Sequence, residues 1–217
     1  MLDFANLSHS IAFISGGVVI TLKFAFFSLL CGLPLGFFLA LGKLSNLWVI
    51  KKLAAIYTSV FRGTPLLVQL GLVYYGSPSL TGYSITAFEA GIITFSLNSA
   101  AYSSEIIRAG IMAIDPGQWD AAKVLGISWL QTWQKVILPQ AIRNILPALV
   151  NEMVDLLKET ALVSVIGEMD LFRRAQVVAA ERFSYFEPVI IAASLYFIMV
   201  MMISFLAKKL EKKFAYA

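Results

Sequence analysis

Three acidic residues follow one another at helical spacing inside an otherwise apolar stretch: Glu152, Asp155 and Glu159. At about 100° per residue their carboxyl groups fall on one stripe of a helix, and Lys158 is expected to point well away from it. Because a stripe of charge is costly against lipid, it must face a cavity, an interface or a ligand. Its chemistry would be ion recognition, since carboxylates accept the planar fork of a guanidinium bidentately.

A second unusual run, Arg62-Gly63-Thr64-Pro65, interrupts another apolar stretch. Pro65 disfavours helical geometry at Thr64, and Gly63 allows a close approach to the backbone. A broken helix with free amide groups suits a bound carboxylate. The alternative is an ordinary proline kink with Arg62 paired to an internal acid, and the sequence leaves both open.

A third set is Asn98, Tyr102 and Glu105, which are separated by four and three residues and share one face of a helix. Asn98 and Tyr102 could hydrogen-bond the polar groups of a ligand or a neighbouring helix equally well. Glu105 is expected to pair with Arg108, three residues further on.

None of these sets has the pattern of a catalytic site. The sequence holds no HExxH pair, no GxSxG elbow and no GxxxxGK[ST] phosphate loop. The one histidine, His9, precedes the first apolar segment, so neither a metal site nor a proton relay is expected. We therefore predict no catalytic and no metal-binding residue.

Composition indicates that membrane-embedded helices position these sets. Of the 217 residues, 59% are apolar and 14% are charged, whereas soluble domains carry about a quarter charged residues. Long apolar runs predict about five transmembrane helices, at 14–41, 54–76, 87–111, 141–167 and 188–207. The expected fold class is an all-α integral membrane protein, with residues 1–217 forming a single transmembrane domain.

The positive charges predict an orientation. The formal charge is +4, but the bases are spread among the apolar segments, so topology explains them better than a nucleic-acid partner. Ten of them lie between segments one and two, between three and four or just beyond, and after segment five, at Lys43, Lys51, Lys52, Lys123, Lys135, Arg143, Lys208, Lys209, Lys212 and Lys213. The bases between segments four and five are balanced by acids: Arg173, Arg174 and Arg182 against Glu168, Asp170, Glu181 and Glu187. This excess predicts three cytoplasmic regions, with the amino terminus outside and the carboxyl terminus inside.

The stretch 112–140 is the most informative part outside the apolar segments. Asp115-Pro116-Gly117 breaks the third segment and offers an N-cap, and Gly126 stops the short helix that follows. A second short helix is expected over 129–137. The first would expose Trp119 at the membrane surface, so it needs either a protein partner or a place on the lipid surface.

The spacing in this stretch resembles a known family. Asp120-Ala121-Ala122, then Gly126, then Ile137-Leu138-Pro139 are similar to the EAA loop of ATP-binding-cassette importer permeases. Further matches are RGTPLLVQ at 62–69, NSAAY at 98–102, SEIIRAG at 104–110, LPQA at 138–141 and LKET at 157–160. Together they resemble the polar amino acid permeases, the histidine, glutamine and arginine uptake type.

The resemblance implies a role for the loop and a set of partners. Its first helix would be the coupling helix that docks on a nucleotide-binding ATPase subunit, through Pro116, Trp119, Asp120, Ala121, Ala122 and Gly126. Asp120 stands where the family has Glu, which keeps the charge and shortens the reach. ATP and Mg would be bound by that partner, so no cofactor is expected in this chain. A second permease copy or a related permease, an extracytoplasmic amino-acid-binding protein and the bacterial inner membrane complete the implied assembly.

The resemblance also implies an amino acid substrate, bound by Arg62, Gly63, Thr64, Asn98, Tyr102, Glu152, Asp155 and Glu159. Since the family usually has an uncharged residue at the position of Asp155, the sequence favours import of basic amino acids: arginine, then lysine or histidine. Glutamine or another polar neutral amino acid is the alternative, if Arg62, Lys158 and protons neutralise the acids. A passive channel is the rival from another class, and the coupling loop argues against it.

Overall fold

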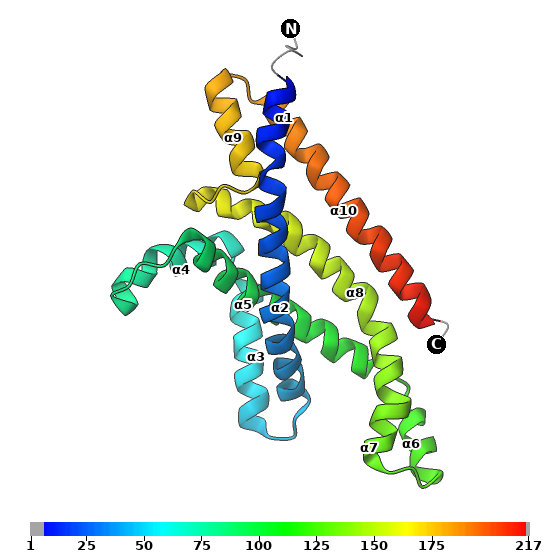
Figure 1. The fold of residues 1–217 in the computed structure, drawn as a ribbon. Coiled ribbons are helices and arrows are strands. Elements are labelled where there is room, and N and C mark those ends of the chain that lie inside the picture. The colour runs from blue at the N-terminus through cyan, green and yellow to red at the C-terminus, as the bar shows by residue number, and fades with distance from the viewer. Residues whose placement is uncertain (1–6, 216–217) are drawn as a thin grey trace.

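A computed structural model of the chain describes residues 7–215, and all regular structure within that range is helical (Figure 1). The helices are α1 (Leu7–Ser15), α2 (Gly17–Leu44), α3 (Trp48–Gly63), α4 (Leu66–Thr81), α5 (Ala87–Met112), α6 (Pro116–Val124), α7 (Trp129–Thr132), α8 (Leu138–Glu159), α9 (Leu171–Arg182) and α10 (Phe186–Ala215). A π-helical turn, η1 (Trp133–Ile137), leads into α8, and a 3-10 helix, η2 (Thr160–Ile166), follows it. The expected all-α class is confirmed, while the two chain ends, to which the predicted orientation refers, lie outside the described residues.

The number of membrane spans is approximate. Within the described range, two helices are long and apolar enough to cross a membrane by length and composition: His9–Leu44, which joins α1 and α2, and Phe186–Lys209 of α10. The predicted segment 54–76 is divided between α3 and α4, which have 16 residues each. The predicted segment 141–167 is divided between α8 and η2. All five predicted segments are helical, but two of them are interrupted.

Small residues let α2 and α5 pack closely against each other. A Cβ atom built on Gly32 would lie 2.9 Å from the backbone oxygen of Ser96, and one on Gly36 would lie 2.9 Å from the Cβ atom of Ser103. Close backbone approach of this kind is how membrane helices gain van der Waals contact. The α2–α5 pair thereby fixes the position of Tyr102 and the rest of α5.

An apolar core ties the end of α8 to the middle of the molecule. It consists of Phe24 of α2, Leu70 of α4, Phe95 of α5, Leu156 of α8 and Val163 of η2, together with smaller neighbours. The rings of Phe24 and Phe95 meet edge to face with their centroids 5.9 Å apart. Since each of these residues comes from a different element, this core holds α8 in place relative to α4 and α5.

The predicted break at Thr64-Pro65 is confirmed. Thr64 and Pro65 have extended backbone conformations between α3 and α4. The Gln69 side-chain amide donates hydrogen bonds to the carbonyl oxygens of Phe61 (2.8 Å) and Thr64 (3.0 Å). These are carbonyl groups that the break frees from the helical ladder, and in a membrane they need such internal partners.

The other proline of this region does not end its helix. Gly76-Ser77-Pro78 predicts a turn, but α4 continues through Pro78 to Thr81 and ends at Gly82, whose φ is 73°. Proline cannot donate to the carbonyl group one turn earlier. The Ser77 hydroxyl donates to that group instead, with 3.1 Å between Ser77 Oγ and the Tyr74 oxygen.

The two ends of the molecule have different structures. Helices α1 and α9 lie at one end, and α6 and α7 at the other (Figure 1). In the loop before α9, Asp170 is fully buried, and its carboxylate accepts hydrogen bonds from the amides of Phe172 (3.1 Å) and Arg173 (2.8 Å) and from the Tyr196 hydroxyl (3.2 Å). Burial raises the pKa of Asp170 to about 6, although these hydrogen bonds lower it. Asp170 thus caps α9 and ties it to α10.

Candidate functional site

A cavity of about 620 Å³ brings four of the predicted site residues together. Tyr102 of α5 faces Glu152, Asp155 and Glu159 of α8 across it. The rest of the lining comes from Lys158, Ala161 and Leu162. Three acids and one base therefore surround a space that is large enough for a small polar ligand.

Helical periodicity explains why the acids of α8 face this cavity. Leu156 and Leu157 are buried in apolar contacts, at 1% and 0% exposure. Asp155 and Glu159 are exposed and Glu152 is half-buried. Around the helix, the fully buried Leu157 lies about 140° from Glu152 and about 200° from both Asp155 and Glu159, so the three carboxylates fall on the side away from it.

Lys158 corrects the prediction that it points away from the acids. Its ammonium lies 2.6 Å from Oδ1 of Asp155, one turn earlier on α8. The two side chains are 55% and 62% exposed, so solvent weakens the pair. The prediction was wrong because it used the direction of the Cα–Cβ bond, whereas a flexible four-carbon stem carries the charge back over the preceding turn.

Arg62 lies at the edge of the cavity and pairs with an internal acid. Its guanidinium carbon is 5.3 Å from the centre of the Tyr102 ring, and its Nη1 atom is 3.7 Å from Glu105 Oε1. Its side chain is 45% exposed. Arg62 thus has the acidic partner of one alternative, beside the broken helix of the other, and it reaches the cavity only through Tyr102.

Gly63, Thr64 and Asn98 are not part of the cavity lining. The Asn98 amide is buried, and it donates hydrogen bonds to the Phe61 carbonyl (3.2 Å) and to Gln69 Oε1 (3.2 Å). Asn98 thus contacts neighbouring helices, which is one of its two predicted roles. Gly63 and Thr64 are exposed at the break, and the space around Gly63 is open.

Glu105 is the centre of a cluster of bases. The expected pair with Arg108 is present, with 2.9 Å between Arg108 Nε and Glu105 Oε2. Lys43 of α2 lies 2.5 Å from Glu105 Oε1 and also donates to the Ser104 hydroxyl. Sequence reasoning predicted only a topological role for Lys43, because nothing local connects it to an acid 62 residues away.

The short helix of the 112–140 stretch forms as predicted. Asp115 caps α6 by accepting from the Gly117 amide (2.8 Å), and Gly126 follows the helix with a φ of 71°. Trp119 corrects the prediction of an exposed ring. It is half-buried, because its ring meets that of Trp133 at 5.2 Å and packs on the small core of Ile114, Ile137 and Ala141.

The outer face of α6 and α7 is apolar and exposed. Val124 is 86% exposed, Leu125 73% and Trp129 71%. Asp120 and Ala121 are also exposed, while Ala122 is buried. We call the exposed residues Asp120, Ala121, Val124, Leu125, Trp129 and Leu130 the α6–α7 face. It lies at the far end of the molecule (Figure 1) and is of the kind that binds a protein partner.

Three residues that sequence reasoning missed support the site. Gln69 completes the break, Lys43 pairs with Glu105, and Asp170 anchors α9 to α10. Only Gln69 had a signal, since it lies within the RGTPLLVQ run. Among the described side chains, those of residues 9–209, no group of three or more His, Cys, Asp or Glu could hold a metal ion.

Residues 32–216 match the family described as the binding-protein-dependent transport system inner membrane component. A relative from Rickettsia bellii (strain RML369-C), a putative glutamine transport system permease protein GlnP, is 51% identical over 208 residues, which are 96% of this chain and 95% of that protein. The arginine transport system permease protein ArtQ of Bacillus subtilis (strain 168) is 48% identical over 212 residues, which are 98% and 97% of the two chains.

Solved structures have the same fold. A chain in the crystal structure of an amino acid ABC transporter with histidines is 46% identical, with a TM-score of 0.91 over 98% of this chain and 99% of that one. A chain of the MetNI methionine ABC transporter in an inward-facing conformation is 18% identical with a TM-score of 0.74, which shows the fold alone. The chain belongs to the family of inner membrane components of binding-protein-dependent transport systems.

Proposed function

We propose that this chain is the permease subunit of an ATP-driven importer of amino acids, and that basic amino acids are its preferred substrates. The observation that carries the proposal is the cavity between α5 and α8, where Glu152, Asp155 and Glu159 outnumber the single base Lys158. A cationic substrate would relieve the mutual repulsion of these acids. A relative named an arginine permease and a related transporter structure with histidines support this choice.

The residues of the cavity suggest how a guanidinium would be bound. Asp155 is exposed and its present partner is the exposed ammonium of Lys158, so a substrate cation can replace that pair without breaking a buried contact. A guanidinium offers paired donors that Asp155 and a neighbouring carboxylate can accept. The released Lys158 ammonium and Arg62, near Tyr102, are then the bases available to the substrate carboxylate.

The break between α3 and α4 is a second place for the substrate carboxylate. The amides of Val68 and Gln69 donate to the Pro65 carbonyl, so those of Leu66 and Leu67 are the ones without a partner in their own helix. Gly63 leaves open space beside the break. Asn98 does not bind the substrate carboxylate in this proposal, since its side-chain amide already donates hydrogen bonds to the Phe61 carbonyl and to Gln69 Oε1. In this proposal Gly63 and Thr64 contribute their backbone at the binding position, and the hydrogen bonds of Asn98 stabilise the break between α3 and α4.

Glutamine is a second candidate substrate. The 2.6 Å pair between Lys158 and Asp155 neutralises one of the three acids before any ligand binds. Five relatives from Rickettsia, at 50–51% identity, are named putative glutamine permeases. A neutral amide would use the remaining carboxylates as hydrogen-bond acceptors without replacing Lys158.

The energy source is assigned to other subunits. The chain has no GxxxxGK[ST] phosphate loop, so ATP and Mg belong to a separate ATPase that docks on the α6–α7 face. A second permease copy or a related permease completes the pathway, and an extracytoplasmic binding protein delivers the amino acid. The end with α6 and α7 then faces the cytoplasm of a bacterium, and the end with α1 and α9 faces outward.

Uptake of labelled arginine into proteoliposomes tests this proposal. The vesicles contain this chain, its ATPase and its binding protein, and unlabelled amino acids compete for uptake. We expect uptake to need ATP and the ATPase, with arginine the strongest competitor, lysine and histidine next, and glutamine weaker. Glutamine as the strongest competitor would overturn the basic preference, and uptake without ATP would overturn the importer.

A further inference from the structure

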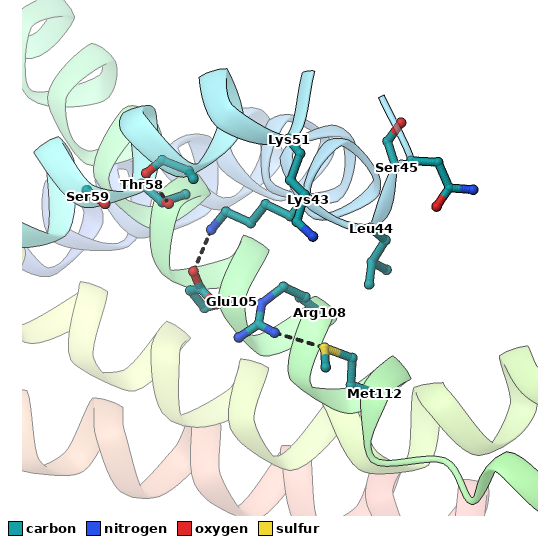
Figure 2. A pocket seen from close by; sticks show the side chains of 11 residues that line it. Lys43, Leu44, Ser45, Lys51, Thr58, Ser59, Glu105, Arg108 and Met112 are labelled. Carbon is teal, nitrogen blue, oxygen red and sulfur yellow. Dashed lines mark hydrogen bonds and ion pairs between the residues drawn. The ribbon is translucent and has the colours of Figure 1, made fainter. Parts of the chain in front are cut away.

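A second cavity, of about 490 Å³, lies where α2 ends and α3 begins, against the end of α5 (Figure 2). It shares no lining residue with the cavity between α5 and α8, which we call the acidic cavity because Glu152, Asp155 and Glu159 line it. Its polar lining consists of Lys43, Ser45, Asn46, Lys51, Thr58, Ser59, Glu105 and Arg108. Three bases and one acid therefore surround it, the reverse of the balance in the acidic cavity.

The positive charge of this cavity is only partly neutralised. Lys43 and Arg108 both pair with Glu105, at 2.5 Å and 2.9 Å. Among residues 9–209, whose side chains the structure describes, Lys51 has no hydrogen bond or ion pair. Figure 2 shows Lys43 and Lys51 extending from neighbouring helices into the space beside Glu105 and Arg108. An anion in this space would meet one unpaired ammonium and two bases that share a single carboxylate.

Hydroxyl groups add uncharged donors. Ser59 is exposed in the cavity wall, and the Ser45 oxygen accepts from the Leu47 amide (3.1 Å), which leaves its proton free to donate. Thr58 is occupied by the carbonyl groups of Ala54 and Ala55. Ammonium and hydroxyl donors around one space are the chemistry that recognises phosphate oxygens.

Neighbouring side chains place this cavity at the level of the lipid head groups. Trp48 is 68% exposed beside it, and the Lys52 ammonium lies 4.6 Å from its ring centre. Exposed tryptophan and lysine are typical of the membrane–water boundary. On the bilayer side of this level, α2 and α3 expose apolar residues such as Phe38 (68%), Leu53 (62%) and Ile56 (51%), where acyl chains can lie.

We propose that this cavity binds the phosphate group of an anionic phospholipid, from the leaflet on the α6–α7 side. Basic pockets between membrane helices on the cytoplasmic side bind anionic head groups. Lys51 and Ser59 hold the phosphate from α3, and Lys43 and Arg108 add charge from α2 and α5. The lipid thereby joins the α2–α3 turn to α5. A soluble phosphate offers the same oxygens, but it has no acyl chains for the exposed apolar surface.

Lipid retention by the purified full-length chain tests the proposal. Native mass spectrometry compares phosphatidylglycerol with phosphatidylcholine on the wild type, Lys51→Gln and Lys52→Gln. The two variants lose the same charge on adjacent residues of one helix, but only Lys51 lines the cavity. We expect Lys51→Gln to lower phosphatidylglycerol retention about fivefold, the effect of one base near anionic lipid. Lys52→Gln should lower retention less, because the Lys52 ammonium lies over the Trp48 ring and not in the cavity. Lys51→Arg should restore binding.

Other results would overturn the proposal. Equal losses in the two glutamine variants would mean that general surface charge retains the lipid. Equal retention of phosphatidylcholine would remove the anionic preference. A further arm adds inorganic phosphate to delipidated protein and measures thermal stability. If phosphate stabilises the wild type as much as phosphatidylglycerol does, and Lys51→Gln abolishes both effects, the ligand is a soluble phosphate and the lipid assignment is wrong.

Discussion

The Lys43 ammonium of α2 lies 2.5 Å from the Glu105 carboxylate of α5, although the two residues are 62 positions apart. Arg108 and Arg62 approach the same carboxylate, at 2.9 Å and 3.7 Å. One acid thus holds bases from α2, α3 and α5. Only 6% of the Lys43 side chain is exposed, against 45% for Arg62, so Lys43 depends most on Glu105.

Glu105→Gln should therefore destabilise the protein more than Lys43→Met does. The first change leaves the buried Lys43 ammonium without a counter-charge, which costs about 3–5 kcal/mol. The second leaves the carboxylate with two arginines, so we expect a loss of about 1 kcal/mol. Thermal unfolding of the two purified variants in detergent shows which one loses more stability. Equal losses, or a larger loss for Lys43→Met, would contradict this account of the cluster.

Asp170 should make stability depend on pH in the direction opposite to that of an ion-paired acid. Burial raises its pKa from 3.8 to about 6. Between these values the folded state keeps a proton that the unfolded state releases, so this contribution to stability is full below about pH 4 and is lost as the pH rises through about 6. The shift corresponds to about 3 kcal/mol.

The Asp170→Asn variant measures this effect, because asparagine stays neutral and still caps the amides of α9. The unfolding free energy of the wild type relative to the variant should fall by about 3 kcal/mol between about pH 4 and pH 7. Asp115→Asn, at the exposed cap of α6, is the control for exchanging a capping aspartate that is not buried. If the unfolding free energies of the wild type and of Asp170→Asn change with pH in parallel, Asp170 does not make stability depend on pH.

Local signals account for the parts of the fold that the sequence predicts well. The cap at Asp115, the stop at Gly126 and the break at Pro65 depend on residues within a few positions of one another. The acidic stripe follows in the same way from the period of a helix. Proline at 78 shows the limit of such signals, because the hydroxyl of Ser77 compensates for the missing donor.

Contacts between distant segments account for what was missed. Lys43 pairs with Glu105, Trp119 contacts Trp133, and Asn98 hydrogen-bonds to Phe61, and each of these contacts forms only when the helices pack. Hydropathy cannot choose between a ligand and a neighbouring helix as the partner of a buried amide. For the same reason the sequence grouped Asn98 with Tyr102, whereas the structure places only Tyr102 in the acidic cavity.

The orientation of the chain can be tested with reporters that are active only outside the cytoplasm. A fusion after Gly82 or Glu181 should be active, because these sites are expected on the side away from α6 and α7. A fusion after Gln131, in α7, should be inactive. Activity after Gln131 would reverse the orientation, and activity at all three sites would remove the proposed topology.

Gly126 should be needed for coupling to the ATPase. Its φ of 71° strains any residue with a side chain, which costs about 1–2 kcal/mol, so Gly126→Val should distort the turn beside the α6–α7 face. Gly82 has nearly the same φ, 73°, at the end of α4. We expect Gly126→Val, but not Gly82→Val, to release the ATPase or uncouple its hydrolysis from uptake. Similar transport by both variants would mean that the α6–α7 face is not the docking element.

The substrate preference rests on Asp155, and the test uses both members of its ion pair. Asp155→Asn removes a carboxylate that we expect to accept a charged hydrogen bond, worth about 1.5–3 kcal/mol. Arginine uptake should therefore fall at least about tenfold, while uptake of a neutral amino acid falls less.

Lys158→Gln removes the base that competes for Asp155 at 2.6 Å, so it should strengthen arginine uptake relative to glutamine uptake. Opposite effects from two neighbours on one helix cannot come from a general loss of folding, and ATPase association serves as the further control. If Asp155→Asn leaves arginine uptake unchanged, or if Lys158→Gln lowers the ratio of arginine uptake to glutamine uptake as Asp155→Asn does, the cavity does not select for a cation.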